Sequence, residues 1–363
     1  MGTGDVAYMD RALSLADRGR GLTSPNPLVG AVVVSPEGVV VGSGYHRRAG
    51  EPHAEVHALR AAGPAAGGGT LFSTLEPCCH MGRTGPCVVR IVEAGVARVV
   101  VAVEDPHPRV RGGGIRFLQA RGLDVTVGVR ETEAARLNQP FFVRIRRGRP
   151  FVMMKAALTL DGRVAEAAGR RSVITGARAQ RESHGLRAEF DAVAVGSETV
   201  LVDDPRLTAR EVHRERPLAR VVFDSRLRTP PSAALVSTLP AGPVIVMTTE
   251  AGVAAAPARA AALELAGVKL LVAPHHDLHA ALAQLDREGI TSILLEGGPR
   301  LQASAWRAGL VDRVRLYVAP FGVGPTGVPW LASQTLLLGM LDDLRVRMVG
   351  PDMSVDGYVH RAD

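Results

Sequence analysis

The chain has 363 residues, of which 46% are hydrophobic and 22% charged, a composition ordinary for a globular protein and a length sufficient for two domains. Its first residues lack a basic stretch followed by an apolar run, and no run of about 18 apolar residues occurs, so we expect a cytoplasmic protein with neither a secretory signal nor a membrane span. The net charge of +7 is scattered along the chain, which favours arginine contacts to a phosphorylated small substrate over a nucleic acid partner.

The first half alternates between helical and strand-like patterns. Apolar residues at helical spacing predict helices at 9–18, 54–62 and 88–94. Short apolar runs rich in β-branched residues predict strands at 29–34, 39–41, 70–74 and 99–103. Helices lying between apolar strands indicate an α/β/α sandwich around a mixed or parallel sheet.

A dense basic run, RIRRGR at 144–149, interrupts this pattern and is followed by Pro150. We interpret the run as a solvated linker and place a domain boundary near residue 147. The expected domains are therefore 1–147 and 148–363.

The second half alternates again and predicts a second α/β domain. Its strands are predicted at 151–158, 192–195, 220–223, 244–247, 268–272, 292–295 and 314–318. Helices between them include 177–189 and 279–288. The segment 230–257, rich in Ala, Pro and Ser, is expected to be a long surface connection around one strand.

Three residues of the first half have the identity and spacing of zinc ligands. The only cysteines, Cys78, Cys79 and Cys87, lie close together in the sequence, which does not fit a disulfide framework. His53 with Cys78 and Cys87 would supply one imidazole and two thiolates and leave the fourth position of a tetrahedral zinc open for catalysis. Zinc activates bound water, and Glu55 would move a proton from that water to a leaving amine. If Cys78 and Cys87, which each follow a proline, open helices, the helix N-termini stabilise the thiolates.

His53-x-Glu55 followed by a Pro-Cys pair is typical of zinc nucleobase deaminases, although here eight residues rather than two separate the ligand cysteines. The alternative is a structural zinc with a fourth ligand such as His57 or His80, in which Glu55 would have no role. We interpret Cys79 as a neighbour of the site, because adjacent residues rarely both reach one metal.

Three longer segments resemble the bifunctional riboflavin-biosynthesis deaminase/reductase family. They are SPNPLVG at 24–30, GYHRRAGEPHAEVHALR at 44–60 and TLEPCCHMGRTGPC at 74–87. The long insert between the cysteines, with its G-x-T, is more specific than the general deaminase pattern. The resemblance implies removal of an amine from a diaminohydroxy-phosphoribosylaminopyrimidine with one zinc ion per chain. It implies substrate contacts from Asn26, His46, His80 and Arg83.

The resemblance continues through the second half. The matching segments are KAALTLDGR at 155–163, ITG at 174–176, GSETVLVDDPRLTAR at 196–210, DSRLR at 224–228 and LLEGGPRL at 294–301. They imply reduction of the ribosyl group to ribityl with NADPH. The fold implied for the whole chain is a cytidine-deaminase-like α/β/α sandwich followed by a dihydrofolate-reductase-like α/β domain.

The same resemblance implies the residues of the reductase site. Cofactor contacts are expected from Ala157, Val173, Thr199, Asp203, Ser225, Gly298, Pro299, Arg300 and Leu301. Substrate contacts are expected from Arg171, Arg187, Leu207, Arg210 and Glu296. The Gly-Gly pair at 297–298 follows an apolar strand, so its backbone N–H groups would approach a diphosphate, unless the pair is an ordinary tight turn.

Lys155 carries a separate prediction. The chain uses arginine almost everywhere, and its only lysines are Lys155 and Lys269. A lysine kept within an apolar strand favours a need for an ammonium rather than a guanidinium. We therefore predict that Lys155 is catalytic and lies near the ribose being reduced; the alternative is a lysine at a strand edge.

The sequence departs from the family at three places. Gly85-Pro86 stands where the family has Pro-Pro, and Cys79 where it has Ser. The family's S-x-W-I-T is replaced by RSVIT at 171–175, in which Val173 cannot stack on a cofactor ring, whereas Arg171 would still meet a phosphate. These changes leave open a deaminase with an impaired or regulatory reductase domain.

A nucleic-acid base deaminase, such as a transfer-RNA editor, would also explain the basic charge. That alternative leaves the long cysteine insert and the second domain unexplained, and an aromatic content of 4% offers no stacking platform. The expected partners are a phosphorylated pyrimidine and a second copy of the chain in a homo-oligomer, with no nucleic acid and no membrane.

Overall fold

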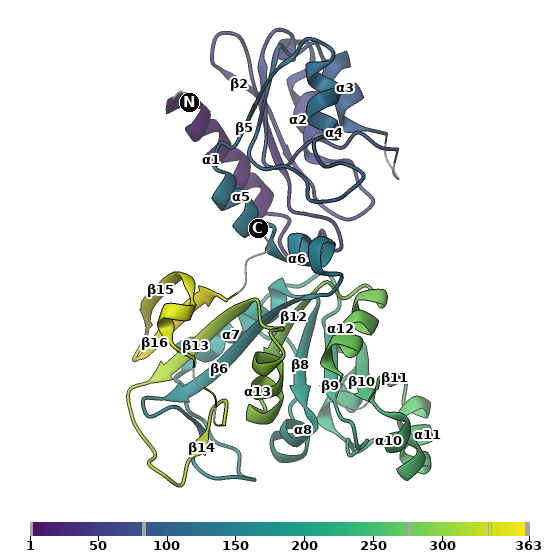
Figure 1. The fold of residues 1–363 in the computed structure, drawn as a ribbon, viewed down its shortest axis with the longest axis vertical. Helices are drawn as coiled ribbons and strands as arrows, with labels where there is room; N and C mark the ends of the chain where they lie inside the picture. Colours follow the sequence, from purple (N-terminus) through teal and green to yellow (C-terminus); the bar gives the residue numbers. More distant parts are fainter. Residues whose placement is uncertain (1–2, 82–84, 275–276, 333, 335, 360–363) are drawn as a thin grey trace. The chain divides into compact units, whose positions relative to one another are not determined.

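The structure is a computed structural model that describes residues 3–81, 85–274, 277–332, 334 and 336–359. The chain divides into two compact units, Met1–Arg147 and Gly148–Asp363. Each unit is built around its own sheet (Figure 1).

A mixed sheet forms the centre of the first unit. In the described part of the chain its five strands have the order β2 (Val40–Tyr45), β1 (Gly30–Val34), β3 (Thr70–Ser73), β4 (Arg98–Val101) and β5 (Asp124–Val127). β1 is antiparallel to β2 and β3, whereas β3, β4 and β5 run parallel. Parallel neighbours need a crossover, which α3 (Cys87–Glu93) and α4 (Gly113–Gln119) provide.

Helices cover both faces of this sheet. On one face lie α2 (Ala54–Ala62), α3 and α4, and on the other α1 (Thr3–Asp17) and α5 (Glu131–Leu137) (Figure 1). A Cβ at Gly30 would collide with the carbonyl oxygen of Ala12 in α1, and one at Gly42 with that of Ala58 in α2. The helices therefore pack directly on strand backbone, as in the expected α/β/α sandwich.

Two predictions near the ends of the first unit are wrong. The first helix begins at Thr3, not at Met9. The prediction rested on the apolar positions alone and left out the more polar turn before them. The basic run is not a solvated linker, since its first four residues close α6 (Gln139–Arg147). Arg149, the last residue of the run, is buried and forms two hydrogen bonds of 2.7 Å with the carboxylate of Asp312.

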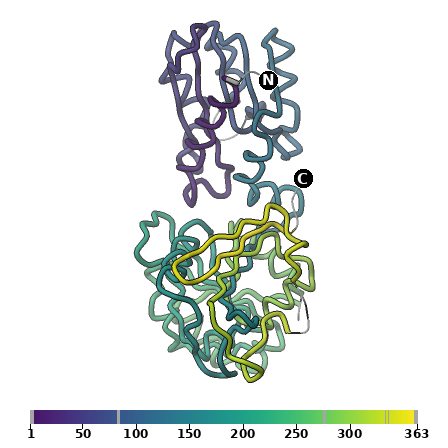
Figure 2. Tube along the Cα trace, turned by 90° about the vertical axis from the view of Figure 1, so that its left-hand side faces the viewer, coloured from purple at the N-terminus to yellow at the C-terminus, as the bar shows by residue number. Residues whose placement is uncertain are grey.

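The second unit contains a larger sheet. In the described residues its nine strands have the order β11 (Lys269–Val272), β10 (Val244–Thr248), β9 (Ala219–Phe223), β8 (Ala192–Gly196), β12 (Ser292–Glu296), β6 (Phe151–Thr159), β13 (Arg313–Ala319), β16 (Asp352–Tyr358) and β15 (Asp342–Val349). All neighbours from β11 to β13 are parallel. The hairpin of β15 and β16, yellow in Figures 1 and 2, adds two antiparallel strands that the sequence did not predict.

The core of this unit lies on both faces of the sheet. Alternate residues of β8, such as Ala194 and Val195, belong to different apolar clusters. One cluster includes residues of α12 (Leu278–Arg287) and α13 (Pro299–Arg307), and the other includes residues of α8 (Ser197–Asp203) and α11 (Pro257–Leu265). Burial on both faces explains why the strands read as continuous apolar runs.

The prediction that 230–257 is a surface connection around one strand is partly wrong. The strand is β10, as expected, but the segment also contains α9 (Ala234–Ser237) and α10 (Glu250–Ala255). Leu235 is fully buried in the core, because the apolar residues between the prolines pack against the sheet.

Candidate active sites

Three zinc-type ligands converge in the first unit. The ligand atoms of His53, Cys78 and Cys87 lie within 4.8 Å of one another, and no other His, Cys, Asp or Glu among the described residues joins them. His53 Nδ1 is 3.2 Å from Cys87 Sγ and 3.5 Å from Cys78 Sγ. One imidazole and two sulfurs at this spacing fit a zinc ion with an open fourth position. His57 and His80, the alternative fourth ligands, are not part of the group.

The ligands come from three different elements. His53 precedes α2, Cys78 lies in an irregular loop after β3, and Cys87 is the first residue of α3. The expectation that Cys78 opens a helix is therefore wrong. Its sulfur instead accepts the backbone N–H of Cys87 at 3.3 Å, so that the first turn of α3 stabilises the neighbouring thiolate.

The two thiols have opposite pKa shifts. Hydrogen bonding by Cys87 and His53 outweighs burial and lowers the pKa of Cys78 to about 4. The hydrogen bond with Cys78, together with burial, raises the pKa of Cys87 well above its ordinary value. Metal binding requires both sulfurs as thiolates, so zinc binding would release any proton that remains on the pair.

Glu55 lies beside the ligands in the first turn of α2. Its side chain is 3% exposed, and burial raises its pKa to about 7, against an opposing effect of His53. Its Oε2 is buried and has no hydrogen-bond partner among the described residues. Buried carboxylate oxygens are normally hydrogen-bonded, so this atom is placed to meet a group that binds next to the metal.

Asn26 and His46 form a second part of this site. Asn26 Nδ2 is 3.1 Å from His46 Nε2, and His46 Nδ1 is 3.2 Å from the carbonyl oxygen of Pro52, the residue before His53. Burial lowers the pKa of His46, which favours the neutral imidazole. The structure therefore connects the segment 24–30 to the zinc ligands through one hydrogen-bonded chain.

The remaining deaminase predictions have different outcomes. The His80 ring stacks on that of His107 with centroids 6.3 Å apart, and its Nδ1 is buried without a hydrogen-bond partner in the described chain. Arg83 lies outside the described residues. Cys79 Sγ contacts the carbonyl oxygen of Arg109 at 3.7 Å and is not part of the ligand group.

Sequence reasoning missed the loop that follows β4. Asp105 is 8% exposed, and burial raises its pKa to about 7, with Glu76 and Cys78 adding to the effect. The carboxylate of Glu76 accepts the backbone N–H groups of Asp105, Gly112, Gly114 and Ile115 at 2.9–3.2 Å. Glu76 thereby fixes this loop beside the segment after β3 that carries Cys78. The sequence feature that could have revealed this loop is the polar segment EDPHP at 104–108, directly after a buried strand.

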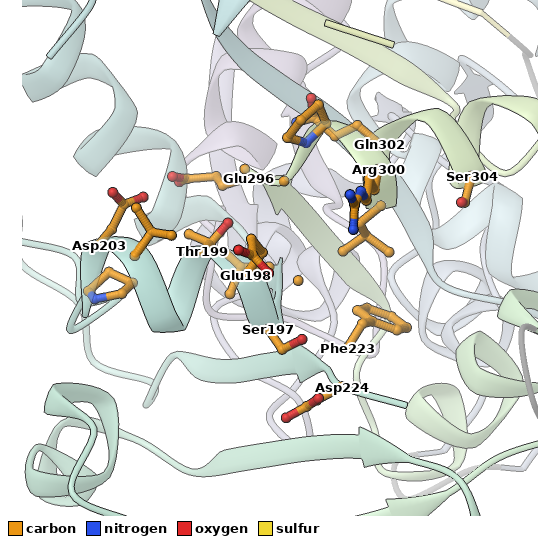
Figure 3. Close-up of a pocket in the computed structure, with 18 of the residues that line it drawn as sticks. Ser197, Glu198, Thr199, Asp203, Phe223, Asp224, Glu296, Arg300, Gln302 and Ser304 are labelled. Carbon is orange, nitrogen blue, oxygen red and sulfur yellow. The ribbon is translucent and has the colours of Figure 1, made fainter. Parts of the chain in front are cut away.

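A large cleft occupies the second unit where the parallel strands end. It has a volume of about 1620 Å³ and is lined by residues at the carboxyl ends of β6, β8, β9, β10 and β12 (Figure 3). Ligands of open α/β sheets bind at this edge. The lining includes the expected residues Lys155, Ala157, Arg171, Arg187, Thr199, Asp203, Leu207, Arg210, Ser225, Glu296, Gly298, Pro299, Arg300 and Leu301. Val173 is not among the lining residues and is 68% exposed.

The turn between β12 and α13 fits a cofactor diphosphate. Gly297 and Gly298 have φ values of 70° and 78°, in the region that disfavours side chains. A Cβ at Gly297 would lie 3.2 Å from Thr199 Oγ1, so a side chain would fill the space in front of the turn. Gly297, Gly298 and the first residues of α13 line the cleft, where a helix start favours a diphosphate, although Pro299 itself has no N–H to donate.

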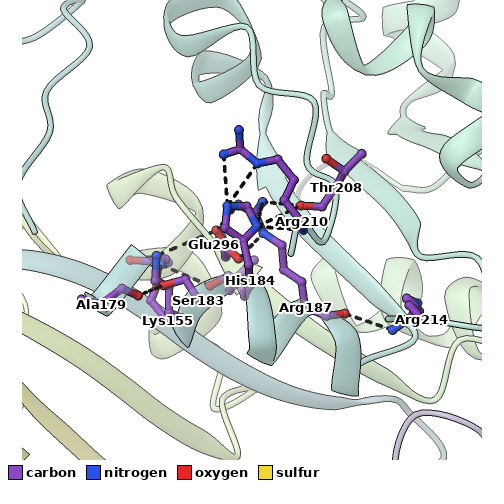
Figure 4. A network of polar contacts seen from close by, with 11 residues as sticks. Lys155, Ala179, Ser183, His184, Arg187, Thr208, Arg210, Arg214 and Glu296 are labelled. Atoms are coloured by element: carbon purple, nitrogen blue, oxygen red, sulfur yellow. Dashed lines mark hydrogen bonds and ion pairs between the residues drawn. The ribbon is translucent and has the colours of Figure 1, made fainter. Parts of the chain in front are cut away.

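An ionic network lines the same cleft around Glu296, the residue directly before this turn (Figure 4). Arg187, in α7 (Ala177–Glu189), donates two hydrogen bonds of 2.8 Å to Glu296, and Lys155 Nζ is 3.9 Å from the same carboxylate. Burial lowers the pKa of Lys155, although Glu296 opposes this. His184, which sequence reasoning missed, lies 3.0 Å from Arg210 Nη2. The basic groups around Glu296 make this part of the cleft suitable for an anionic substrate.

The network predicts an acid-sensitive contribution to stability. Burial alone would raise the pKa of Glu296, but Arg187 and Lys155 outweigh it and hold the pKa at about 2, below its ordinary value of 4.5. Ionised Glu296 therefore stabilises the fold above pH 4.5, and this stabilisation is lost as the pH falls towards 2. We expect the difference in free energy of unfolding between wild type and E296Q to shrink by about 2 kcal/mol between pH 6 and 3 in denaturant titrations. A constant difference would contradict this.

Each unit of the chain matches a known protein family whose description fits the site found in that unit. Residues 3–103 match the cytidine and deoxycytidylate deaminase zinc-binding region, and residues 150–360 match the RibD C-terminal domain. The chain is 44% identical to the riboflavin biosynthesis protein RibD of Aquifex aeolicus over 87% of each chain. It is 41% identical to the protein of that name from Escherichia coli over 96% of this chain and 98% of the other. The chain belongs to the RibD family. 

Solved RibD structures share the fold of the whole chain. Acinetobacter baumannii RibD superposes with a TM-score of 0.86 at 36% identity and 98% coverage of both chains. A deaminase/reductase from Thermotoga maritima, described as acting on diaminohydroxyphosphoribosylaminopyrimidine and 5-amino-6-(5-phosphoribosylamino)uracil, gives 0.84 at 30% identity and the same coverage. The expected cytidine-deaminase-like and dihydrofolate-reductase-like folds are confirmed, as is the bifunctional activity with zinc and NADPH.

Among the described residues, none of the helices combines the length and the apolar character that crossing a bilayer requires.

Proposed function

We propose that the two sites perform consecutive steps of riboflavin biosynthesis through the residues that the sequence predicted. The first step is hydrolytic deamination of 2,5-diamino-6-(5-phosphoribosylamino)pyrimidin-4(3H)-one, and the second is NADPH-dependent reduction of the ribosyl chain to ribityl. The observation that carries the assignment of residues is the convergence of His53, Cys78 and Cys87 beside buried Glu55, in a chain whose second unit holds Lys155 in a separate cleft.

In the deaminase site, His53, Cys78 and Cys87 would hold zinc, which when bound would supply activation of the water that attacks the ring carbon carrying the amine. Glu55 accepts a proton from the attacking water and delivers it to the departing nitrogen. The water oxygen becomes the new carbonyl oxygen, and the amine leaves as ammonia. Asn26 and His46, joined by their 3.1 Å contact, orient the pyrimidine from the other side.

In the reductase site, the turn at Gly297 and Gly298 would hold NADPH, which when bound would supply hydride for C1 of the ribosyl group. We place the Lys155 ammonium where it protonates the sugar ring oxygen as the C1–O bond opens, so that one hydride and one proton are added. Glu296 balances the charge of Lys155, and Arg187 holds Glu296 in place through its paired hydrogen bonds. Arg210, whose guanidinium contacts His184 in this structure, is assigned to the substrate phosphate.

Assays of the purified protein with the diaminopyrimidine phosphate, with and without NADPH, test this assignment. Ammonia release should not need NADPH, whereas NADPH oxidation should follow deamination. Ammonia release without NADPH oxidation, even from pre-deaminated substrate, would leave only the deaminase and favour the reading that departures such as Arg171 and Val173 impair the second domain.

We also propose a reducing compartment, the cytoplasm, because the zinc ligands Cys78 and Cys87 must remain unoxidised and the second step consumes NADPH.

The homo-oligomer is proposed to form along β15. This strand ends the sheet, and Leu344, Val346 and Met348 expose 42%, 54% and 65% of their surface along it. An exposed apolar edge strand is a template for pairing with a second copy. We expect light scattering to give a multiple of 38.3 kDa for the wild type and a smaller mass for V346E. L265E, at a residue 92% exposed on α11, should keep the wild-type mass. A monomeric wild type, or an unchanged mass in V346E, would contradict the proposal.

A further inference from the structure

The segment 24–30, which carries Asn26, is held by a residue that lies far away in the sequence. The Leu28 N–H donates to Asn138 Oδ1 at 2.7 Å, and Asn138 Nδ2 donates to the Leu28 carbonyl oxygen at 2.9 Å. We propose that Asn138 is a positioning residue of the deaminase site, which fixes this segment so that Asn26 faces the pyrimidine. The inference rests on the substrate contact proposed for Asn26.

The chemistry of the contact suits a positioning role. A carboxamide presents an acceptor and a donor in one plane, and therefore pairs with both backbone groups of a single residue. Leu28 lies before β1, so in the described part of the chain its N–H and C=O have no partner strand. Asn138 is 2% exposed, which shields both hydrogen bonds from competition by water.

Asn138 is itself held rigidly. It lies between α5 and α6, where its N–H donates to the Ala134 carbonyl oxygen at 3.2 Å and its carbonyl oxygen accepts the N–H of Phe142 at 3.0 Å. Both helices thus fix the backbone from which the side chain reaches Leu28. A side chain on such a support holds its partner in one place and does not follow its motion.

The rest of the segment transmits this position to the catalytic centre. Just beyond Leu28, the Val29 carbonyl oxygen accepts the N–H of His46 at 2.8 Å. Just before it, the Asn26 side chain lies 3.1 Å from Nε2 of the same histidine. Displacement of Leu28 would therefore move Asn26 and disturb His46, whereas His53 and the cysteines are anchored by other elements.

The test compares N138L, N26A and the double variant N26A/N138L in the full-length zinc enzyme. Leu fills nearly the same volume but leaves both Leu28 backbone groups unpaired, so N138L should raise the KM of ammonia release from the diaminopyrimidine phosphate about tenfold, with a smaller change in kcat. Because Asn138 acts through the segment that carries Asn26 and contacts His46, the losses in the double variant should be less than additive. Zinc content should stay at one ion per chain. The KM and kcat of the reductase with pre-deaminated substrate should also not change, since that site lies in the other unit.

The possible outcomes distinguish the positioning role of Asn138 from the substrate contact proposed for Asn26. An unchanged KM in N138L, or additive losses in the double variant, would overturn the role of Asn138. A wild-type KM in N26A would instead overturn the substrate contact of Asn26, and the inference with it. If N138L does not fold, as shown by loss of both activities, N138D decides, because it keeps the acceptor for the Leu28 N–H and loses the donor. A raised KM in N138D supports the inference, and a wild-type KM overturns it.

Discussion

Replacing Glu55 with Gln is expected to slow ammonia release about 10³-fold, the size of effect typical for loss of a general acid–base group. Gln fills the same space and can still hydrogen-bond, but it cannot accept a proton from water and return it to nitrogen. The buried Oε2 of Glu55 has no hydrogen-bond partner in the described chain, and its carboxylate interacts with His53, Cys78 and Cys87. The measurement is single-turnover ammonia release together with the zinc content of the same sample.

Two controls make the Glu55 result specific. E93Q changes a glutamate of α3 whose side chain is 56% exposed and paired with Arg90, and it should keep wild-type ammonia release. The E55Q protein should still reduce pre-deaminated substrate at the wild-type rate, which shows that the chain is folded. Wild-type ammonia release by E55Q with its zinc retained would contradict the assigned role.

The deaminase site shows which features a sequence can reveal. Ligand identity was predictable, because His53, Cys78 and Cys87 carry their chemistry in residue type and spacing alone. The setting of Cys78 was not predictable, since its stabilising N–H comes from the start of α3 and depends on how the loop closes. Glu76 and Asp105 were missed for a similar reason, because β3 and β4 place them together only once the strand order is known.

In the second unit, too, some features could be predicted from the sequence and others could not. Strands buried on both faces were predicted because their apolar runs need no partner to be recognised, as at 192–195 and 292–295. β15 was missed because it alternates charged residues with exposed apolar ones, and its only strand partner in the described chain is β16. The sequence predicted Arg187 as a substrate contact, yet its guanidinium is paired with Glu296, which lies 109 residues away and comes near only through the parallel sheet.

Lys155→Arg is expected to lower NADPH oxidation about 10²-fold or more, although it preserves the positive charge. Lys155 and Glu296 are direct neighbours on β6 and β12, so the ammonium reaches a fixed point beside the carboxylate. A guanidinium is longer and planar, would form its own paired hydrogen bonds with Glu296, and gives up a proton far less readily than an ammonium. Burial already lowers the pKa of Lys155, which makes its proton easier to transfer.

The matched control is Lys269→Arg, because Lys269 is the other lysine of the chain and pairs with Glu288 through a half-exposed side chain on β11. K269R should keep both activities. In K155R, ammonia release and the affinity for NADPH, measured by fluorescence titration, should stay at wild-type values, because the cofactor turn at Gly297 and Gly298 is unchanged. A loss of NADPH affinity equal to the loss of turnover would make Lys155 a binding residue. Full turnover in K155R would show that the reaction needs only a positive charge beside Glu296, and the proton for the sugar oxygen would then have to come from another group in the cleft.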